Sequence, residues 1–182
     1  MIKFCKYCGS GINYYVPEGD SIKRAVCRSC HYIDYENPKI IAGVLPVYEN
    51  KILLCKRSIE PKRNKWTIPS GFLELNETVS QGALREAQEE AGISPDIQNL
   101  YCLYNLPHIG QVYLLYLATL NEQKAVPGHE TTEVNFFSMD AIPWEDIAFS
   151  SVTFVLRHYI SDYPSKVFPF RTGAFNPQDQ SS

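Results

Sequence analysis

The chain has 182 residues, enough for one domain of ordinary size and a small appendage. Its 45% hydrophobic and 20% charged residues are typical of a globular protein, and the net charge of −3 gives no support to a general nucleic-acid or acidic-membrane binder. No apolar run approaches the roughly 18 residues of a membrane helix, and no charged-then-apolar leader precedes Cys5, so we expect a cytoplasmic protein without a membrane partner.

Four of the six cysteines form two pairs near the start of the chain, Cys5-x2-Cys8 and Cys27-x2-Cys30. This spacing indicates a zinc ribbon, in which four thiolates bind one tetrahedral ion. A disulfide is the alternative, which the missing secretory leader disfavours. Residues 1–36 carry few aliphatic side chains, so zinc would supply most of their folding energy. Their basic and acidic side chains nearly balance, so we expect a structural role and no nucleic-acid partner.

A second unit is expected to begin at Asn37-Pro38. The segment KIIAGVLPVYENKILLCKRS predicts two strands joined by a turn at Glu49-Asn50, with Arg57 at the end of the second. The basic loop Ile59 to Lys65 follows, and its cations would either meet phosphates or face solvent. Residues 66–69 then predict a short strand that leads into a turn.

The most informative stretch is GFLELNETVSQGALREAQEEAGI, residues 71–93. It predicts a helix that Asn76 or Glu77 caps and Gly92 ends. We expect Gly82, which lies toward the acidic face, to make room for a ligand. Three acids share one face of this helix, without a basic residue at the right spacing to pair with them: Glu86, Glu89 and Glu90. A hard divalent cation such as Mg²⁺ or Mn²⁺ would offset their repulsion, and a solvated acidic face is the alternative.

The remaining elements follow in a simple order. Strands are predicted at Leu100 to Asn105, Gln111 to Thr119 and Val134 to Phe137, and a last helix from Ser150 or Ser151 to about Tyr163. The end of the chain, residues 171–182, is polar and is expected to be a flexible tail.

The spacing G-x5-E-x7-REA-x-EE-x-GI over residues 71–93 resembles in full the signature of the Nudix hydrolase family. The resemblance implies an α/β fold, an α/β/α sandwich with a mixed sheet, in residues 37–170 after a small zinc ribbon in residues 1–36. It also implies a pyrophosphohydrolase that acts on acid anhydrides and hydrolyses a nucleoside diphosphate linked to another moiety.

The same resemblance assigns roles to individual residues. The ligands of Mg²⁺ or Mn²⁺ would be the carbonyl of Gly71 and the carboxylates of Glu86, Glu90 and Glu130. Arg85 would orient the carboxylates through charge-assisted hydrogen bonds. Glu89 would assist at the metal, and Glu133 is the second choice after Glu130. Glu89 and Glu133 remain alternatives for the general base.

The substrate needs a separate argument. A zinc ribbon before the signature suggests the NADH pyrophosphatases, but their SQPWPFP element is missing. The segment YCLYNLPHIGQVYLLYL, residues 101–117, looks like the plant plastid FAD pyrophosphatases instead. FAD or ADP-ribose is therefore the expected substrate, cleaved to AMP and another monophosphate. A pyrophosphatase of NADH or NAD-capped RNA and a non-catalytic nucleotide sensor are the alternatives. Family habit suggests a homodimer.

Five side chains are candidates for substrate binding, one arginine and four aromatics: Arg57, Trp66, Phe72, Tyr104 and Tyr113. The aromatics could stack on adenine or isoalloxazine. A place in the core is the alternative for each of them.

Overall fold

The computed structural model describes residues 1–176, and the chain divides into two compact units. The ribbon unit is Met1–Asn37, and the sheet unit begins at Pro38. In the ribbon unit, three short antiparallel strands pair in the order β1 (Ile12–Tyr15), β2 (Arg24–Cys27) and β3 (Ile33–Asp34). Its core consists of four small or medium-sized buried residues, Cys5, Ile12, Ala25 and Cys27. So small a core needs another source of stability.

A mixed sheet of eight strands forms the centre of the sheet unit. The strands are β4 (Lys39–Tyr48), β5 (Lys51–Arg57), β6 (Trp66–Thr67), β7 (Ser70–Phe72), β8 (Asp96–Leu106), β9 (Gln111–Thr119), β10 (Thr131–Ser138) and β11 (Arg171–Ala174). Across the sheet the order is β10-β5-β4-β9-β8-β11, with β6 added to β5 and β7 to β4. The pairs β4–β9 and β8–β11 are parallel, and the other pairs are antiparallel.

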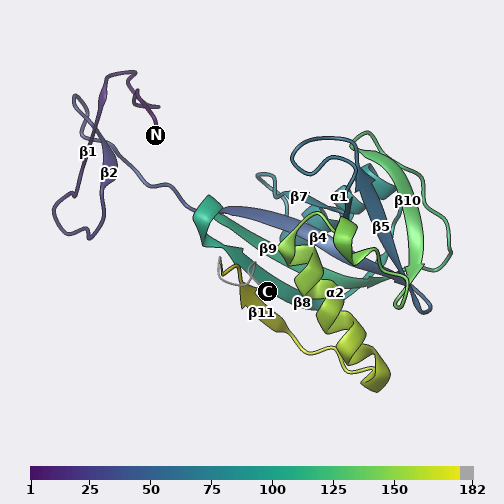
Figure 1. Ribbon diagram of the computed structural model, residues 1–182. Helices are drawn as coiled ribbons and strands as arrows, with labels where there is room; N and C mark the ends of the chain where they lie inside the picture. The colour runs from purple at the N-terminus through teal and green to yellow at the C-terminus, as the bar shows by residue number, and fades with distance from the viewer. Residues whose placement is uncertain (177–182) are drawn as a thin grey trace. The chain divides into compact units, whose positions relative to one another are not determined.

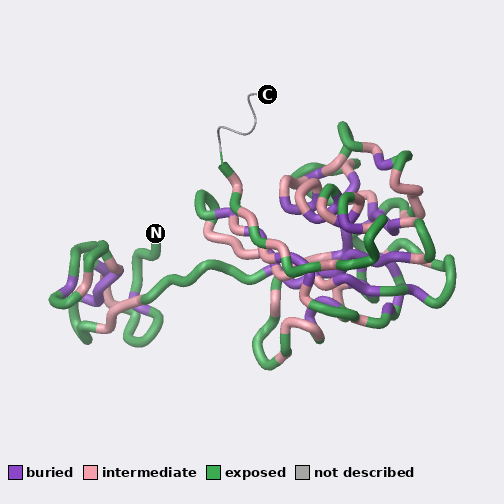
Figure 2. The backbone as a smooth tube through the Cα atoms, turned by 90° about the horizontal axis from the view of Figure 1, so that it is seen from below, coloured by how far each residue is buried: buried purple, intermediate pink, exposed green. Residues whose placement is uncertain are grey.

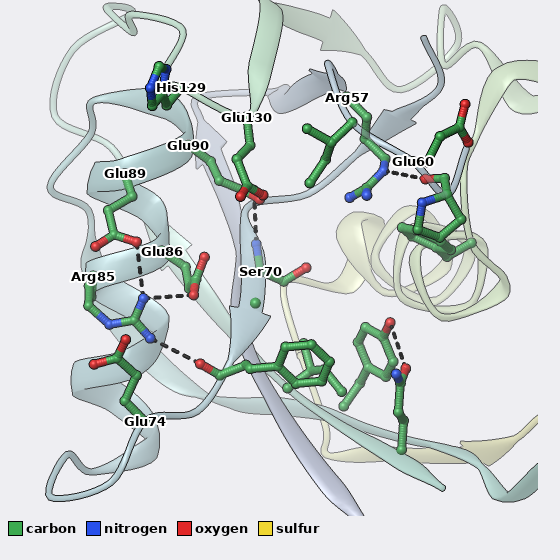
Figure 3. A pocket seen from close by; sticks show the side chains of 18 of the residues that line it. Arg57, Glu60, Ser70, Glu74, Arg85, Glu86, Glu89, Glu90, His129 and Glu130 are labelled. Carbon is green, nitrogen blue, oxygen red and sulfur yellow. Dashed lines mark hydrogen bonds and ion pairs between the residues drawn. The ribbon is translucent and has the colours of Figure 1, made fainter. Parts of the chain in front are cut away.

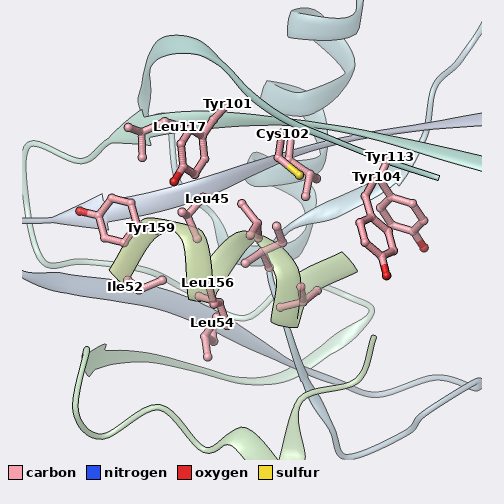
Figure 4. Close-up of a cluster of buried hydrophobic side chains, with 14 of the residues drawn as sticks. Leu45, Ile52, Leu54, Tyr101, Cys102, Tyr104, Tyr113, Leu117, Leu156 and Tyr159 are labelled. Carbon is pink, nitrogen blue, oxygen red and sulfur yellow. The ribbon is translucent and has the colours of Figure 1, made fainter. Parts of the chain in front are cut away.

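Two helices cover opposite faces of this sheet, α1 (Val79–Ala91) and α2 (Ser150–Asp162) (Figure 1). Under α1, small side chains pack closely on the sheet: Ala83, Ala87 and Ala91 against Ala42, Val44 and Leu53. Under α2 lies the larger core, which includes Leu45, Ile52, Tyr101, Leu156 and Tyr159 (Figure 4). Figure 2 shows the buried backbone running through the middle of this unit, with exposed loops around it. The predicted α/β/α sandwich is confirmed.

Strand β4 is the central buried strand, and it positions two strands that carry pocket residues. It is buried from Ile41 to Val47, because both faces of the sheet are covered, and such strands carry near-continuous apolar runs. One edge of β4 pairs first with β7, at Ile41 and Ala42, and later with β5, at Val47 and Tyr48. The strands β5 and β7 therefore use the same edge in turn, and Arg57 at the end of β5 and Ser70 to Phe72 of β7 both line the pocket described below.

The helix caps differ from the predicted ones. Thr78, rather than Asn76 or Glu77, caps α1, and it forms a reciprocal capping box with Gln81. The left-handed Gly92, with φ 62°, ends the helix as expected. Helix α2 begins after Phe149, without a side-chain hydrogen bond at its cap, so neither predicted serine fills that role.

The end of the chain is more ordered than expected. Arg171–Ala174 form strand β11 in parallel with β8, and Asn105 Nδ2 donates to the Gly173 carbonyl at 3.1 Å. The prediction of a flexible tail from residue 171 is wrong for this strand, because its side chains and backbone find partners on β8 and α2. The last six residues of the predicted tail, 177–182, lie outside the described part of the chain. Short 3₁₀ helices, η1 (Pro107–Ile109), η2 (Trp144–Asp146) and η3 (Tyr163–Ser165), complete the connections. Within residues 1–176, no helix is long and apolar enough to cross a membrane.

Candidate active site and zinc site

The four cysteines of the ribbon unit converge on one point. The Sγ atoms of Cys5, Cys8, Cys27 and Cys30 all lie within 4.8 Å of one another. Three of the pairwise distances are 3.4 to 3.7 Å. Four ligands about 2.3 Å from a tetrahedral zinc ion would lie about 3.8 Å apart, so the separations fit zinc. Backbone N–H groups of Tyr7, Ser29 and Cys30 donate to Cys5 and Cys27 Sγ at 3.4 Å, as expected around thiolates.

A pocket of about 750 Å³ opens in the sheet unit, and the signature acids line one end of it (Figure 3). Gly71 on β7 lies against Glu86 on α1, since a Cβ added to Gly71 would come within 2.4 Å of Glu86 Oε1. Glu90, about one turn further along the helix, is 7% exposed and accepts a hydrogen bond from the Ser70 N–H at 3.2 Å. The predicted metal-binding residues of the signature are therefore neighbours.

Burial gives these carboxyl groups unusual acidities. Burial raises the pKa of Glu90 to about 8, and the charges of Glu86 and Glu130 add to it, against the Ser70 N–H and Arg57, which lower it. Burial also raises the pKa of Glu86, although Arg85 opposes the shift. An ionised carboxylate in such surroundings requires a compensating positive charge.

Arg85 supplies part of that charge. The prediction that no basic residue pairs with these acids is therefore wrong. Its guanidinium donates to Glu86 at 2.7 Å, to Glu89 at 3.1 Å and to the Phe72 carbonyl at 3.1 Å. Two further hydrogen bonds of 2.9 and 3.1 Å reach Glu77, whose Oε1 also accepts from the Glu74 N–H. Arg85 thus ties the helix to strand β7 and to the loop between them, which supports its predicted orienting role.

The space beside Gly82 is occupied by side chains of this loop, not left open for a ligand. A Cβ on Gly82 would come within 2.7 Å of Glu77 Oε1 and 2.8 Å of Leu73 Cδ1. The prediction of a ligand contact at Gly82 is therefore wrong. The helix loses some intrinsic stability at this glycine, and the loop can pack closely in return.

A second loop brings Glu130 to the same pocket. Gly128 donates from its N–H to the Glu90 carbonyl at 3.0 Å, and an added Cβ would lie 1.6 Å from the Glu89 carbonyl oxygen. Only glycine can approach the helix so closely. The Glu130 carbonyl accepts from the Ser58 N–H at 2.9 Å, which fixes the other side of the loop. Glu130 lines the same pocket, and its side chain points toward that of Glu90 (Figure 3).

Glu133 lies elsewhere. It is on β10, its side chain is 49% exposed, and its carboxylate pairs with Lys56 at 3.3 Å. It is not among the residues that line the pocket. The structure therefore separates the two acids that the sequence left as alternatives to one another.

The other end of the pocket is mainly apolar, with one arginine. Arg57 lines it, donates to the Pro61 carbonyl at 2.9 Å and lies 5.1 Å from the centre of the Phe149 ring. Of the basic loop, Ile59, Glu60 and Pro61 line the pocket, whereas Lys65 pairs with Asp146 at 2.7 Å. Arg57 and Arg85 are thus the pocket's two arginines among the residues described.

The four aromatic candidates divide into two pairs. Phe72, 52% exposed, and Tyr113 line the pocket. Trp66 and Tyr104 do not, because they pack in the core against Phe137 and Phe154 with ring centres 4.9 and 5.0 Å apart. Several lining residues were not predicted as site residues, among them Ile59, Pro61, His129 and Phe149. His129 and Phe149 are distant in sequence from the signature, and Ile59 and Pro61 belong to the basic loop, in which only the cations were candidates.

The comparisons with known proteins agree with this geometry. A NUDIX domain model matches residues 37–155, and the Nudix N-terminal model of the zinc ribbon matches residues 3–36. The chain belongs to the Nudix family. A crystal structure of a NUDIX hydrolase from Nitrosomonas europaea is 47% identical, with a TM-score of 0.92, and covers 96% of this chain and 99% of its own. The predicted enzyme class, a Nudix pyrophosphohydrolase, is confirmed at the level of the family.

Two further relatives are more distant in sequence. The ADP-ribose pyrophosphatase of Methanocaldococcus jannaschii is 30% identical over 115 residues, which cover 60% of this chain and 67% of that protein. The NAD-capped RNA hydrolase NudC of Vibrio atlanticus is 28% identical over 147 residues, or 78% of this chain. The chain spans about half (51%) of that relative's length.

Proposed function

We propose that this Nudix enzyme hydrolyses the diphosphate bond of ADP-ribose or FAD and releases AMP with a second monophosphate. The observation that carries the proposal is the convergence of Glu86, Glu90 and Glu130 beside Gly71 at one end of a 750 Å³ pocket. Pockets of this volume hold ligands of nucleotide size. The apolar end would receive the organic part of the substrate, and the acidic end would receive the diphosphate.

The donor set fits a hard divalent cation. Glu86 and Glu90 are largely buried and carry raised pKa values, so a cation bound between them and Glu130 would satisfy charges that Arg85 and Ser70 satisfy only in part. Mg²⁺ and Mn²⁺ prefer such oxygen ligands, and the Gly71 carbonyl would complete the set. When bound, such ions polarise a diphosphate and lower the pKa of a coordinated water.

The protein's own groups would then bind and orient the substrate. Arg57 has guanidinium nitrogens beyond the one that contacts Pro61, and these would donate to a phosphate oxygen. Arg85 would hold Glu86 and Glu89 in place through its hydrogen bonds to both. We assign Glu89, which lines the pocket, as the acceptor of the attacking water's proton.

The choice of substrate draws on separate supports. The archaeal relative named for ADP-ribose favours ADP-ribose, and the plant-like segment at residues 101–117 favours FAD. The NudC relative supports a second candidate, the diphosphate of NADH or of NAD-capped RNA. A non-catalytic nucleotide sensor is the remaining alternative, and the complete set of signature acids argues against it.

A substrate screen tests the proposal directly. ADP-ribose, FAD, NADH and NAD-capped RNA would each be incubated with the zinc-loaded protein and Mg²⁺ or Mn²⁺, and the products identified by mass. We expect AMP together with ribose 5-phosphate or FMN. Glu90→Gln should lower the rate by several orders of magnitude, because it removes a metal-binding charge. A hundredfold preference for NADH or for the capped RNA would replace the proposed substrate, and full activity of Glu90→Gln would refute the metal assignment.

A further inference from the structure

The apolar end of the pocket has a defined floor on the α2 face of the sheet. Residues directly opposite each other on paired strands point to the same face. Ile41 on β4 lies opposite Phe72 on β7 and opposite Tyr113 on β9, so these three side chains form one row. All three line the pocket. The row therefore has one exposed ring, that of Phe72, next to Ile41 and Tyr113, which are 4% and 9% exposed and border the pocket from the core.

The row ends where helix α2 covers the sheet. Tyr104 on β8 is the next residue across, opposite Tyr113, and the two lie side by side in Figure 4. The Tyr104 ring lies 5.0 Å from that of Phe154 on α2 and does not line the pocket. Phe72 is at the open end of the row and is 52% exposed. The ammonium of Lys39 lies 5.2 Å from the centre of this ring but is outside the pocket lining.

A polar side chain borders the floor. Gln111 lines the pocket and is opposite Lys39 on the neighbouring strand, one step along the same face from Tyr113. Its Oε1 accepts from the Tyr113 hydroxyl at 3.4 Å, which leaves its amide N–H groups directed elsewhere. An amide beside an aromatic surface is suited to a nucleobase, whose face stacks and whose edge carries hydrogen-bonding groups.

The start of α2 and the loop after β5 line the pocket next to this row of side chains. Phe149 precedes α2, and Pro61 belongs to the loop after β5; both line the pocket, and Arg57 contacts both. The acids on α1 lie on the other side of strand β7, where Gly71 precedes Phe72 directly. A substrate whose diphosphate meets those acids would thus reach the floor with its neighbouring nucleoside.

We propose that Phe72, Ile41 and Tyr113 form the seat of the substrate's adenine ring, and that Gln111 hydrogen-bonds to its edge. This rests on the proposed function, since the orientation follows from a diphosphate at the acidic end. Phe72 and Gln111 then determine which base is accepted, without taking part in the chemical step.

Steady-state kinetics with paired variants test the seat. Phe72→Leu should raise KM for ADP-ribose about tenfold and leave kcat within about twofold, because stacking on the ring is lost and the acids stay in place. Gln111→Leu should reduce the preference for ADP-ribose over the hypoxanthine analogue IDP-ribose by about tenfold. Tyr104→Phe is the matched control, since this ring is in the same row but outside the pocket, and its KM should equal that of the wild type.

A second readout does not depend on turnover. Saturation-transfer NMR of adenosine with protein freed of Mg²⁺ and Mn²⁺ should show contact at the base protons in the wild type and a loss of contact in Phe72→Leu. If the wild type hydrolyses none of the substrates and this NMR difference persists, the proposed function fails and the seat stands. If the wild type hydrolyses ADP-ribose and Phe72→Leu keeps its KM, or loses kcat alone, the seat is refuted.

Discussion

The sequence leaves two glutamates as alternative candidates for the general base, and the structure places them in different surroundings. Both side chains are partly exposed and both are in ion pairs, but Glu89, bonded to Arg85, lines the pocket, whereas Glu133, paired with Lys56 on β10, does not. We expect Glu89→Gln to lower kcat by 10² to 10⁴, about the usual contribution of a general base. Glu133→Gln should stay within about twofold, because it breaks only an exposed ion pair. The opposite ranking of kcat would return Glu133 to the site.

Two glycines beside the pocket should respond differently to an added methyl group. In Gly71→Ala the new Cβ meets the carboxylate of Glu86, the end of a side chain that can move. We expect a melting temperature near that of the wild type and a large loss of activity, because Glu86 is displaced. In Gly128→Ala the Cβ meets the Glu89 backbone carbonyl, which cannot move without shifting the helix.

The expected result for Gly128→Ala is therefore a loss of stability, about 2 kcal/mol or more, measured by urea unfolding. Gly11→Ala is a suitable control, since its Cβ would meet Arg28 atoms at an ordinary 3.6 Å. A stable Gly128→Ala with full activity would show that the loop carrying Glu130 can relax away from the helix.

At the scale of elements, one buried acid joins three of them. Asp162, the last residue of α2, is 6% exposed and accepts hydrogen bonds from Tyr101 on β8 at 2.7 Å and from Arg171 on β11. Burial alone would raise the pKa of Asp162, but the hydrogen bonds from Arg171 and Tyr101 outweigh it and hold the pKa below its usual range. Asp162 thus favours folding while it is ionised.

The pH dependence follows from the sign of that shift. The unfolded chain binds the proton at a higher pH than the folded protein, so the stabilisation is complete above the unfolded pKa, about 3.9, and is lost as the pH falls through the lower folded value. We expect Asp162→Asn to cost about 1 to 2 kcal/mol at pH 7, where Tyr101 and Arg171 lose a charged partner. The difference from the wild type, measured by urea unfolding, should shrink below pH 4. A difference that is constant with pH would contradict this role.

The elements show which features local sequence can predict. Strands β4, β5 and β9 were predictable because their apolar patterns reflect burial against covering helices, and the signature acids were predictable because their spacing is local. Thr78 and Gln81 form a capping box that was visible in the sequence but was assigned to neighbouring residues. Strand β11 was not predictable, because four residues with partners on β8 and α2 carry no periodicity of their own.

Local sequence likewise does not predict which residues line the pocket. Trp66 and Phe72 are both aromatic residues near the signature, yet Trp66 packs beneath Phe137 and Phe72 remains open. Whether such an aromatic residue is buried depends on the residues that cover it from a neighbouring strand or helix. The pairing between strands distant in sequence determines which residues these are. Likewise, Glu130 lines the pocket and Glu133 does not, and their spacing of three residues does not reveal this difference.

At the scale of the whole molecule, the two units differ in what holds them together. The sheet unit has two extensive apolar cores, whereas the core cluster of the ribbon unit has four residues, two of them from the cysteine cluster. We therefore expect zinc binding to supply most of the folding free energy of the ribbon unit. Removing zinc should unfold residues 1–37 and leave the sheet unit folded.

Hydrogen exchange read by mass spectrometry can follow both units in one sample. After treatment with a strong chelator, peptides from residues 1–37 should exchange at nearly unfolded rates, while those from β4 and α1 keep their protection. Cys27→Ser should give the same pattern without chelator, and Cys102→Ser, a buried cysteine of the sheet unit, should not loosen the ribbon unit. Zinc analysis should give one equivalent per chain. Protection in residues 1–37 that survives complete removal of zinc would mean that strand pairing and the small core suffice, and that the four thiolates are not the main source of the ribbon's stability.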